Sequence, residues 1–196
     1  MNWKIKIRIV VVSVLLLALL STIFGCDLNL EGHDADWETC SQEIDDHPCN
    51  FSLIDQNGDE FQLYDHYGKI IILEFSAMWC RPCQSAAKEV EQVQDEYSDD
   101  IVYVTVLIEN EFRDPPVHRD INKWAKVFKI KDAPVLIGSR RMLNTNPASG
   151  WPLTAWPHFF IINKEMILKK SFTGFQEGKI ELVILDMLKD DLETSD

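Results

Sequence analysis

Two nearly continuous apolar runs and the stretch between them organise the middle of this chain. Residues 70–75 and 101–108 are rich in β-branched and large apolar side chains, which is typical of strands buried on both faces. Between the two runs, apolar side chains recur at helical spacing, at Ala86, Ala87, Val90, Val93 and Tyr97. Strand, helix and strand of this length predict a right-handed βαβ unit with two parallel strands.

Shorter signals flank this unit on both sides. Residues 50–54 alternate between apolar and polar side chains, and the Asn-Gly pair within 55–58 then predicts a hairpin turn. After the unit come, in order, a helix around Trp124, a short strand over 133–137, a strand–turn–strand over 159–172 and an amphipathic helix over 180–188. This order predicts an α/β fold, with parallel and antiparallel strands in one sheet covered by helices.

The amino terminus resembles a targeting segment. Three basic residues precede an almost uncharged apolar run over 9–24, as in a signal peptide. The next residues complete the sequence Ile23-Phe24-Gly25-Cys26, which resembles a bacterial lipoprotein lipobox and implies a lipid on Cys26. An uncleaved membrane anchor stays open, because the run approaches the roughly 17–25 residues that span a bilayer, and so does ordinary cleavage. All three alternatives predict export, and the first two predict anchoring on the periplasmic or other extracytoplasmic face of the cell membrane.

The chain is strongly acidic, and this charge restricts its possible partners. The chain carries 32 acidic and 19 basic residues, a net charge of −13, so nucleic-acid phosphates and anionic lipid head groups would repel it. We therefore expect no nucleic-acid partner, and expect membrane attachment through the amino-terminal segment. The predicted organisation is a lipoprotein-type signal peptide or anchor over 1–25, a tether over 26–49, a folded domain over 50–190 and an acidic tail over 191–196.

The four cysteines after Cys26 fall into two pairs. Export permits a structural disulfide between Cys40 and Cys49, with two free thiols as the alternative. Cys80 and Cys83 stand where the first apolar strand passes into a helix. A helix start offers unpaired N–H groups and a partial positive charge, which favour thiolate over thiol. Because such a pair can exchange a disulfide with another molecule, the sequence predicts a redox site here.

Several motifs resemble those of thioredoxin-fold proteins. Trp79-Cys80-Arg81-Pro82-Cys83 resembles their Trp-Cys-x-x-Cys active site, and Thr154-Ala155-Trp156-Pro157 resembles the segment that ends in their cis-proline. The start of the domain, over 50–58, is similar to the TlpA-like (redoxin) group of membrane-tethered thiol–disulfide oxidoreductases. The resemblance implies a thioredoxin fold over about 50–190. Its central mixed β-sheet would be flanked by helices, with an N-terminal β-hairpin extension and an inserted helix and strand.

The resemblance also implies a catalytic role for three residues. Cys80 would be the attacking thiol and Cys83 the resolving thiol of a redox-active disulfide. Glu74 occupies the place of a buried acid behind that disulfide, where burial should raise its pKa and suit it to accept the proton of Cys83. The alternative for Glu74 is an edge carboxylate that reaches solvent.

Five further residues would form the active-site loop and bind substrate. Trp79, Arg81 and Pro82 surround the cysteines, and the charge of Arg81 should help to hold the Cys80 thiolate. Pro82 is shared with reducing thioredoxins, which favours a reductase. Pro157 would follow a cis bond, and Trp156 would offer backbone groups to a substrate strand. The Trp156 indole could equally serve core or surface packing.

Together these features predict an exported, membrane-tethered thiol–disulfide oxidoreductase that acts on protein thiols and disulfides without a diffusible cofactor. The resembling group implies a membrane-embedded electron donor and, among its substrates, the haem-site cysteines of apocytochrome c in cytochrome c maturation. Two alternatives remain open. One is a thiol peroxidase of the same superfamily, and the other is a copper- or zinc-binding module that uses the same cysteines. We expect no metal, because one Cys-x-x-Cys supplies only two of the four ligands that structural zinc requires.

Overall fold

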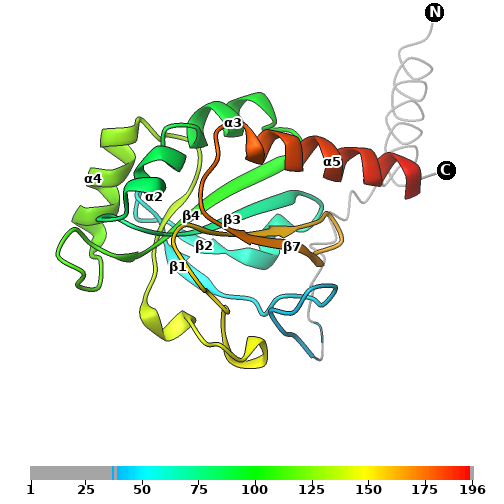
Figure 1. Ribbon diagram of the computed structural model, residues 1–196, viewed down its shortest axis with the longest axis horizontal. Coiled ribbons are helices and arrows are strands. Elements are labelled where there is room, and N and C mark those ends of the chain that lie inside the picture. Colours follow the sequence, from blue (N-terminus) through cyan, green and yellow to red (C-terminus); the bar gives the residue numbers. More distant parts are fainter. Residues whose placement is uncertain (1–36, 38, 195–196) are drawn as a thin grey trace, which may run out of the picture. The chain divides into compact units, whose positions relative to one another are not determined.

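The computed structural model describes residue 37 and residues 39–194. The predicted signal peptide or anchor over 1–25 and the predicted lipid attachment at Cys26 lie outside these residues. Within the described part, no helix combines the length and the apolar character needed to cross a membrane. Figure 1 shows this part as a twisted sheet with its helices gathered over one face.

A mixed five-stranded sheet forms the centre, in the order β5-β4-β3-β6-β7. Its strands are β3 (Ile70–Ala77), β4 (Ile101–Glu109), β5 (Val135–Ile137), β6 (His158–Ile162) and β7 (Leu168–Thr173). The central strand β3 runs parallel to β4 and antiparallel to β6. The two apolar runs therefore become the neighbouring strands β3 and β4, and the predicted mixed sheet is confirmed.

A separate hairpin precedes the sheet. It joins β1 (Ser52–Ile54) and β2 (Glu60–Gln62), which pair antiparallel, and the 3₁₀ helix η1 (Leu63–His66) follows. In the turn, Asp55 Oδ1 accepts the N–H groups of Asn57 and Asp59. Gly58 has a φ of 92°, a conformation that a residue without a Cβ adopts at little cost. This is the predicted N-terminal hairpin extension.

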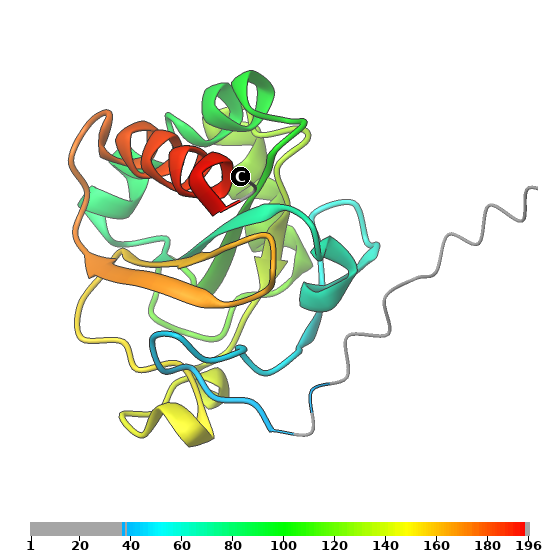
Figure 2. The same cartoon turned by 90° about the vertical axis from the view of Figure 1, so that its right-hand side faces the viewer.

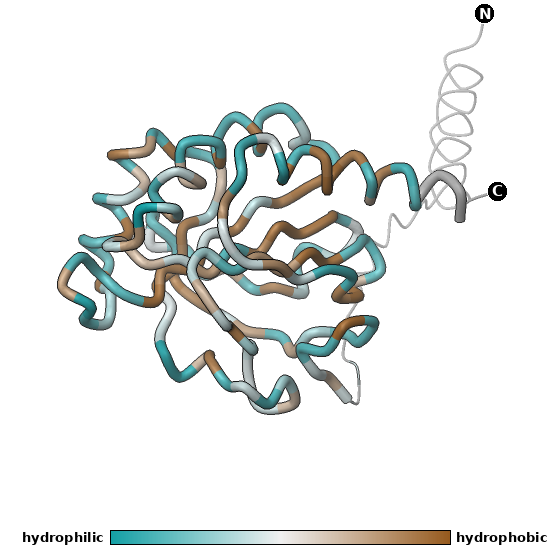
Figure 3. Tube along the Cα trace, viewed as in Figure 1, coloured by the Kyte–Doolittle hydropathy of each residue, from teal (hydrophilic) through white to brown (hydrophobic). Residues whose placement is uncertain are grey.

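The helices and the hairpin cover opposite faces of the sheet. Side chains of α2 (Arg81–Ala86), α3 (Val90–Glu96), α4 (His118–Phe128) and α5 (Lys179–Thr194) join one buried cluster with Ile70 and Ile72 of β3. The alternate residues Ile71, Leu73 and Phe75 point to the other face, where Phe61, Leu63 and Trp151 cover them. In Figure 3 the apolar stretches follow the strands accordingly. The predicted inserted helix and strand correspond to α4 and β5.

Two helices differ from the sequence prediction. The expected single helix after Cys83 is divided into α2 and α3, because the N–H groups of Lys88 and Glu89 bond to carbonyls three residues back. Both pieces turn an apolar side to the same cluster, so the apolar spacing does not reveal the division. At the other end, α5 continues to Thr194 and takes up residues that were expected to form a tail.

The predicted domain boundary at residue 50 is also corrected. Residues 39–49 were expected to be tether, yet they pack on the domain through backbone hydrogen bonds. Asp45 N–H donates to Leu168 O at 2.8 Å, and Leu168 N–H donates to Asp46 O at 2.9 Å. Gln42 N–H donates to Pro147 O at 3.0 Å, and Figure 2 shows this blue segment beside the yellow loop between β5 and β6. The folded domain therefore starts before residue 50.

Candidate active site

The Cys80–Cys83 pair lies at the junction of β3 and α2. Cys80 is the N-cap of α2, and its Sγ accepts the N–H of Cys83 at 3.2 Å. Pro82 stands in the first turn of the helix, where its missing N–H costs nothing. The two cysteines are joined in a disulfide, with Cys80 4% exposed and Cys83 fully buried. Of the two sulfur-bearing residues, Cys80 is therefore the more accessible to a partner.

Glu74 lies fully buried in the middle of β3. Its carboxylate accepts hydrogen bonds from the Ser76 hydroxyl and, at 3.0 Å, from the Tyr103 hydroxyl. Burial raises the pKa of Glu74 to about 7, against the opposing effect of these two hydrogen bonds. An edge carboxylate in contact with solvent, the alternative for Glu74, is wrong because no part of the residue is exposed. At neutral pH this carboxyl can both take up and release a proton.

Glu74 belongs to a buried polar cluster that the sequence analysis missed. Ser76 follows it on the same face of β3, while Tyr103 and Thr105 occupy one face of β4, and Thr105 pairs with Glu74 in register. All four residues are buried. Burial also raises the pKa of Tyr103, and the neighbouring Glu74 adds to the effect. The available signal was polar side chains at every second position of two otherwise apolar strands.

The Trp156–Pro157 segment leads into β6. The peptide bond between the two residues is cis, and Trp156 is partly buried against both hydrophobic clusters. The next residue, His158, is buried, with Nε2 2.7 Å from Ser171 Oγ and Nδ1 accepting the Thr154 N–H at 3.4 Å. Burial lowers the pKa of His158 to about 4, so its ring is neutral at physiological pH and it serves as a structural strand residue.

Trp79 is held by a second group that the sequence analysis missed. Its indole N–H donates to Glu109 Oε2 at 2.7 Å. Glu109 is only 2% exposed, and its other oxygen accepts the Nε–H of Arg140 at 2.5 Å within an ion pair. The guanidinium carbon of Arg113 lies 4.1 Å from the centre of the Trp79 ring, a cation–π contact. The end of β4 and two loops thus fix the side chain that precedes Cys80, whereas Arg81 is exposed.

The sequence matches the AhpC/TSA family over residues 44–171. The chain belongs to this family. The thiol-disulfide oxidoreductase ResA of Bacillus subtilis (strain 168) is 31% identical over 130 residues, which cover 64% of each chain. The thioredoxin-like protein YneN of the same strain is 24% identical over 130 residues, 66% of this chain and 71% of YneN.

Solved structures agree with these sequence matches. The pneumococcal exposed lipoprotein thioredoxin Etrx1 from Streptococcus pneumoniae strain TIGR4 superimposes with a TM-score of 0.59 and 28% identity, over 70% of this chain and 99% of Etrx1. The predicted thioredoxin fold and the resemblance to TlpA-like redoxins are therefore confirmed. This AhpC/TSA-family member is a thioredoxin-like thiol–disulfide oxidoreductase.

A second disulfide, between Cys40 and Cys49, lies near the start of the described residues. Cys40 is exposed and Cys49 is partly buried. Between them, His47 stacks on Trp37 with 3.9 Å between ring centres, and its Nδ1 lies 2.8 Å from Met166 O. The disulfide thus closes the segment that packs on the domain before the hairpin.

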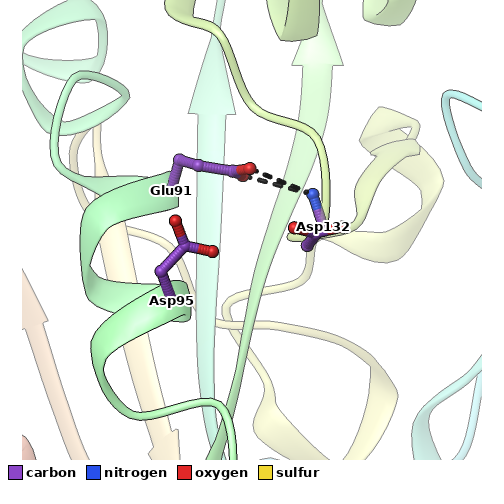
Figure 4. A group of neighbouring side chains, drawn as sticks. All are labelled: Glu91, Asp95 and Asp132. Atoms are coloured by element: carbon purple, nitrogen blue, oxygen red, sulfur yellow. Dashed lines mark hydrogen bonds between the residues drawn. The ribbon is translucent and has the colours of Figure 1, made fainter.

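A group of carboxylates that could in principle hold a metal ion lies away from the cysteines. Among the described residues, the carboxylates of Glu91, Asp95 and Asp132 lie within 4.8 Å of one another (Figure 4). Glu91 already accepts the N–H groups of Lys131 at 2.7 Å and Asp132 at 3.2 Å. It therefore anchors the loop after α4 to α3, and the group includes neither Cys80 nor Cys83.

Proposed function

We propose that this protein is an exported, membrane-tethered reductase that transfers two electrons from Cys80 and Cys83 to disulfides of other proteins. The hydrogen bond from Cys83 N–H to Cys80 Sγ carries this proposal. Once the disulfide is reduced, that bond and the start of α2 favour the thiolate of Cys80 over its thiol. Cys80 is also the more exposed of the two residues.

In the proposed cycle, the Cys80 thiolate attacks one sulfur of a substrate disulfide. A mixed disulfide forms, and the other substrate sulfur leaves as a thiolate. Cys83 then gives its proton to Glu74, directly or through water, and attacks the Cys80 sulfur. The substrate is released with two thiolates, which take up protons from water, and the protein keeps the two oxidised sulfurs as the Cys80–Cys83 disulfide. The pKa of Glu74, about 7, suits this proton transfer at neutral pH.

The residues around the cysteines would bind the substrate, and a separate donor would reduce the disulfide again. The backbone at Trp156 and Pro157 would pair with an extended substrate segment, next to the loop of Trp79, Arg81 and Pro82. A membrane-embedded dithiol donor would reduce the Cys80–Cys83 disulfide again, so the cycle requires no diffusible cofactor. Cysteines of proteins in cytochrome c maturation are the substrates we propose by analogy with the TlpA-like group.

The same proposal includes tethering at the extracytoplasmic face. We propose that residues 1–25 direct export, that Cys26 carries a lipid and that the chain up to the docked segment spans the distance to the membrane. The sequence around Cys26 supports this proposal, as does the likeness to Etrx1, a lipoprotein. The test compares the membrane fraction of cells that express the wild type or Cys26→Ser. The variant should lose the lipid mass from its N-terminal peptide, whereas an uncleaved anchor would leave both proteins in the membrane without that mass.

The activity is tested by insulin reduction with dithiothreitol, and by the reduction potential of the Cys80–Cys83 couple in glutathione buffers. We expect the wild type to accelerate insulin precipitation over dithiothreitol alone, Cys80→Ser to give no acceleration, and the couple to have a potential of about −270 mV. A potential near about −120 mV would instead indicate an oxidant. Hydrogen peroxide turnover faster than insulin reduction would favour the thiol peroxidase.

A further inference from the structure

A compact turn follows β4 at the edge of the sheet that carries the active site. Residues 110–114 close on themselves, since Asn110 N–H donates to Asp114 O at 2.9 Å and Arg113 N–H donates to Asn110 O at 3.1 Å. The Asn110 side-chain oxygen accepts the N–H groups of Phe112 and Asp114 at 2.9 and 3.1 Å. In Figure 1 the loop that holds this turn projects between β4 and α4. Hydrogen bonding therefore fixes the shape of the turn.

The turn is attached to the residue that precedes Cys80. Glu109, just before the turn, accepts the N–H of Met78 through its carbonyl at 3.0 Å and the indole N–H of Trp79 through its carboxylate. Arg113 covers one face of the Trp79 ring. Arg113 also has a φ of 70°, a conformation that is unfavourable for a residue with a Cβ and tends to persist at functional sites. Its side chain thus links the turn to the active-site loop.

Phe112 stands in the middle of this turn and points its ring into water. It is 81% exposed, more than the other large apolar side chains among the described residues, of which Leu182 follows at 69%. A fixed turn that exposes an aromatic ring gains nothing for folding, because the ring buries little surface within the chain. Beside a site that must receive a polypeptide, the same ring offers apolar contact area at a small cost in conformational entropy.

We propose that residues 110–114 form a substrate-docking turn in which Phe112 is a specificity-determining residue. Phe112 packs on an apolar side chain of the substrate polypeptide, close in sequence to the cysteine that Cys80 attacks. Arg113 is a positioning residue that holds the turn against Trp79. This inference rests on the proposed function, since it names the class of substrate that the Cys80–Cys83 pair selects. The partner is a polypeptide disulfide with an apolar neighbour, because Phe112 adds no charge or hydrogen bond of its own.

The test compares two synthetic peptide disulfides that differ only in a leucine or a serine two residues from the cysteine. The reduced full-length protein is mixed with each peptide and with a small aromatic disulfide, dithiobis(nitrobenzoate). We expect the wild type to react with the leucine peptide about five- to tenfold faster than with the serine peptide, the gain from partly burying a Phe side chain. Phe112→Ala should abolish this preference, and the rate of each protein with the small disulfide serves to normalise its two peptide rates.

Two further variants serve as control and as second test. Leu182→Ala removes a similarly exposed apolar side chain from α5 and should keep the wild-type preference. Arg113→Asn keeps a residue that tolerates a positive φ but removes the guanidinium from Trp79. It should reduce the preference and change the fluorescence of Trp79.

Measurable but equal rates with the two peptides in the wild type, or an unchanged preference in Phe112→Ala, would overturn the inference. An unchanged preference in Arg113→Asn would overturn the positioning role. Failure of the proposed function has a different signature, because then neither the wild type nor any variant would reduce either peptide disulfide, whatever its rate with the small disulfide.

Discussion

Replacement of Glu74 by glutamine should change how the stability of the protein depends on pH. Glu74 is fully buried, and its hydrogen-bond partners among the described residues are the hydroxyls of Ser76 and Tyr103. Glutamine has nearly the same shape and can bond to both hydroxyls, but it has no ionisable proton. Glu74→Gln therefore removes the titration and largely keeps the packing.

The size of this change in stability follows from the shift in the pKa of Glu74. This pKa is about 7 in the folded chain, against an ordinary value of 4.5. Between these values the unfolded chain loses the proton while the folded chain keeps it, so the free energy of unfolding falls as pH rises from 4.5 to about 7. It then levels off. A tenfold change in proton affinity corresponds to about 1.4 kcal/mol, so the loss amounts to about 3 kcal/mol. The variant lacks this loss and should be the more stable protein above pH 7.

The assay is urea unfolding of the oxidised protein at several pH values from 4.5 to 8, followed by Trp fluorescence. Glu165→Gln is the matched control, since it removes a carboxylate from an exposed position, and its curve should follow that of the wild type. The difference in unfolding free energy between Glu74→Gln and the wild type should grow with pH and reach its plateau above pH 7. A constant difference across the whole range would refute the assignment of a raised pKa to Glu74.

The remaining predictions concern the other buried or cross-linked groups. Burial lowers the pKa of His158 to about 4, so the unfolded chain takes up a proton first as pH falls below 6.5, and stability should be lost between pH 6.5 and 4. His158→Gln should lack this part of the acid destabilisation in urea titrations at pH 7 and 4.5, and equal losses in both proteins would contradict the assignment. The Cys40–Cys49 disulfide closes a loop with a sequence separation of 9. The double variant Cys40→Ser, Cys49→Ser should therefore lose roughly 2.5 kcal/mol of unfolding free energy but keep its rate with a small disulfide, and unchanged stability would contradict a structural role.

The sequence carried enough information for the sheet and for the place of the redox pair. The runs over 70–75 and 101–108 are long, apolar and β-branched, which leaves few arrangements other than adjacent buried strands. The position of Cys80 and Cys83 follows from the same argument, because a strand followed by a helical pattern fixes where the helix begins. The hairpin turn was also predictable, because the Asn-Gly pair that forms it is a signal contained within a few neighbouring residues.

Features that depend on partners distant in sequence could not be predicted in this way. The segment over 39–49 packs on the domain mainly through backbone hydrogen bonds to Pro147 and Leu168, which leave no mark on side-chain periodicity. The division between α2 and α3 was hidden because both helices keep an apolar side toward one cluster. The bonds of Glu109 to Trp79 and Arg140 join three separate segments, so only the folded structure brings them together.

The central claim is that Cys80 attacks and Cys83 resolves, and trapping of the mixed disulfide tests it most directly. Reduced Cys83→Ser and Cys80→Ser proteins are incubated with a protein disulfide, and the adducts are located by mass spectrometry of the peptides. The account predicts a stable mixed disulfide on Cys80 in the Cys83→Ser protein and little adduct on Cys83 in the Cys80→Ser protein. An adduct that forms on Cys83 as fast as on Cys80, or no adduct on Cys80, would contradict it.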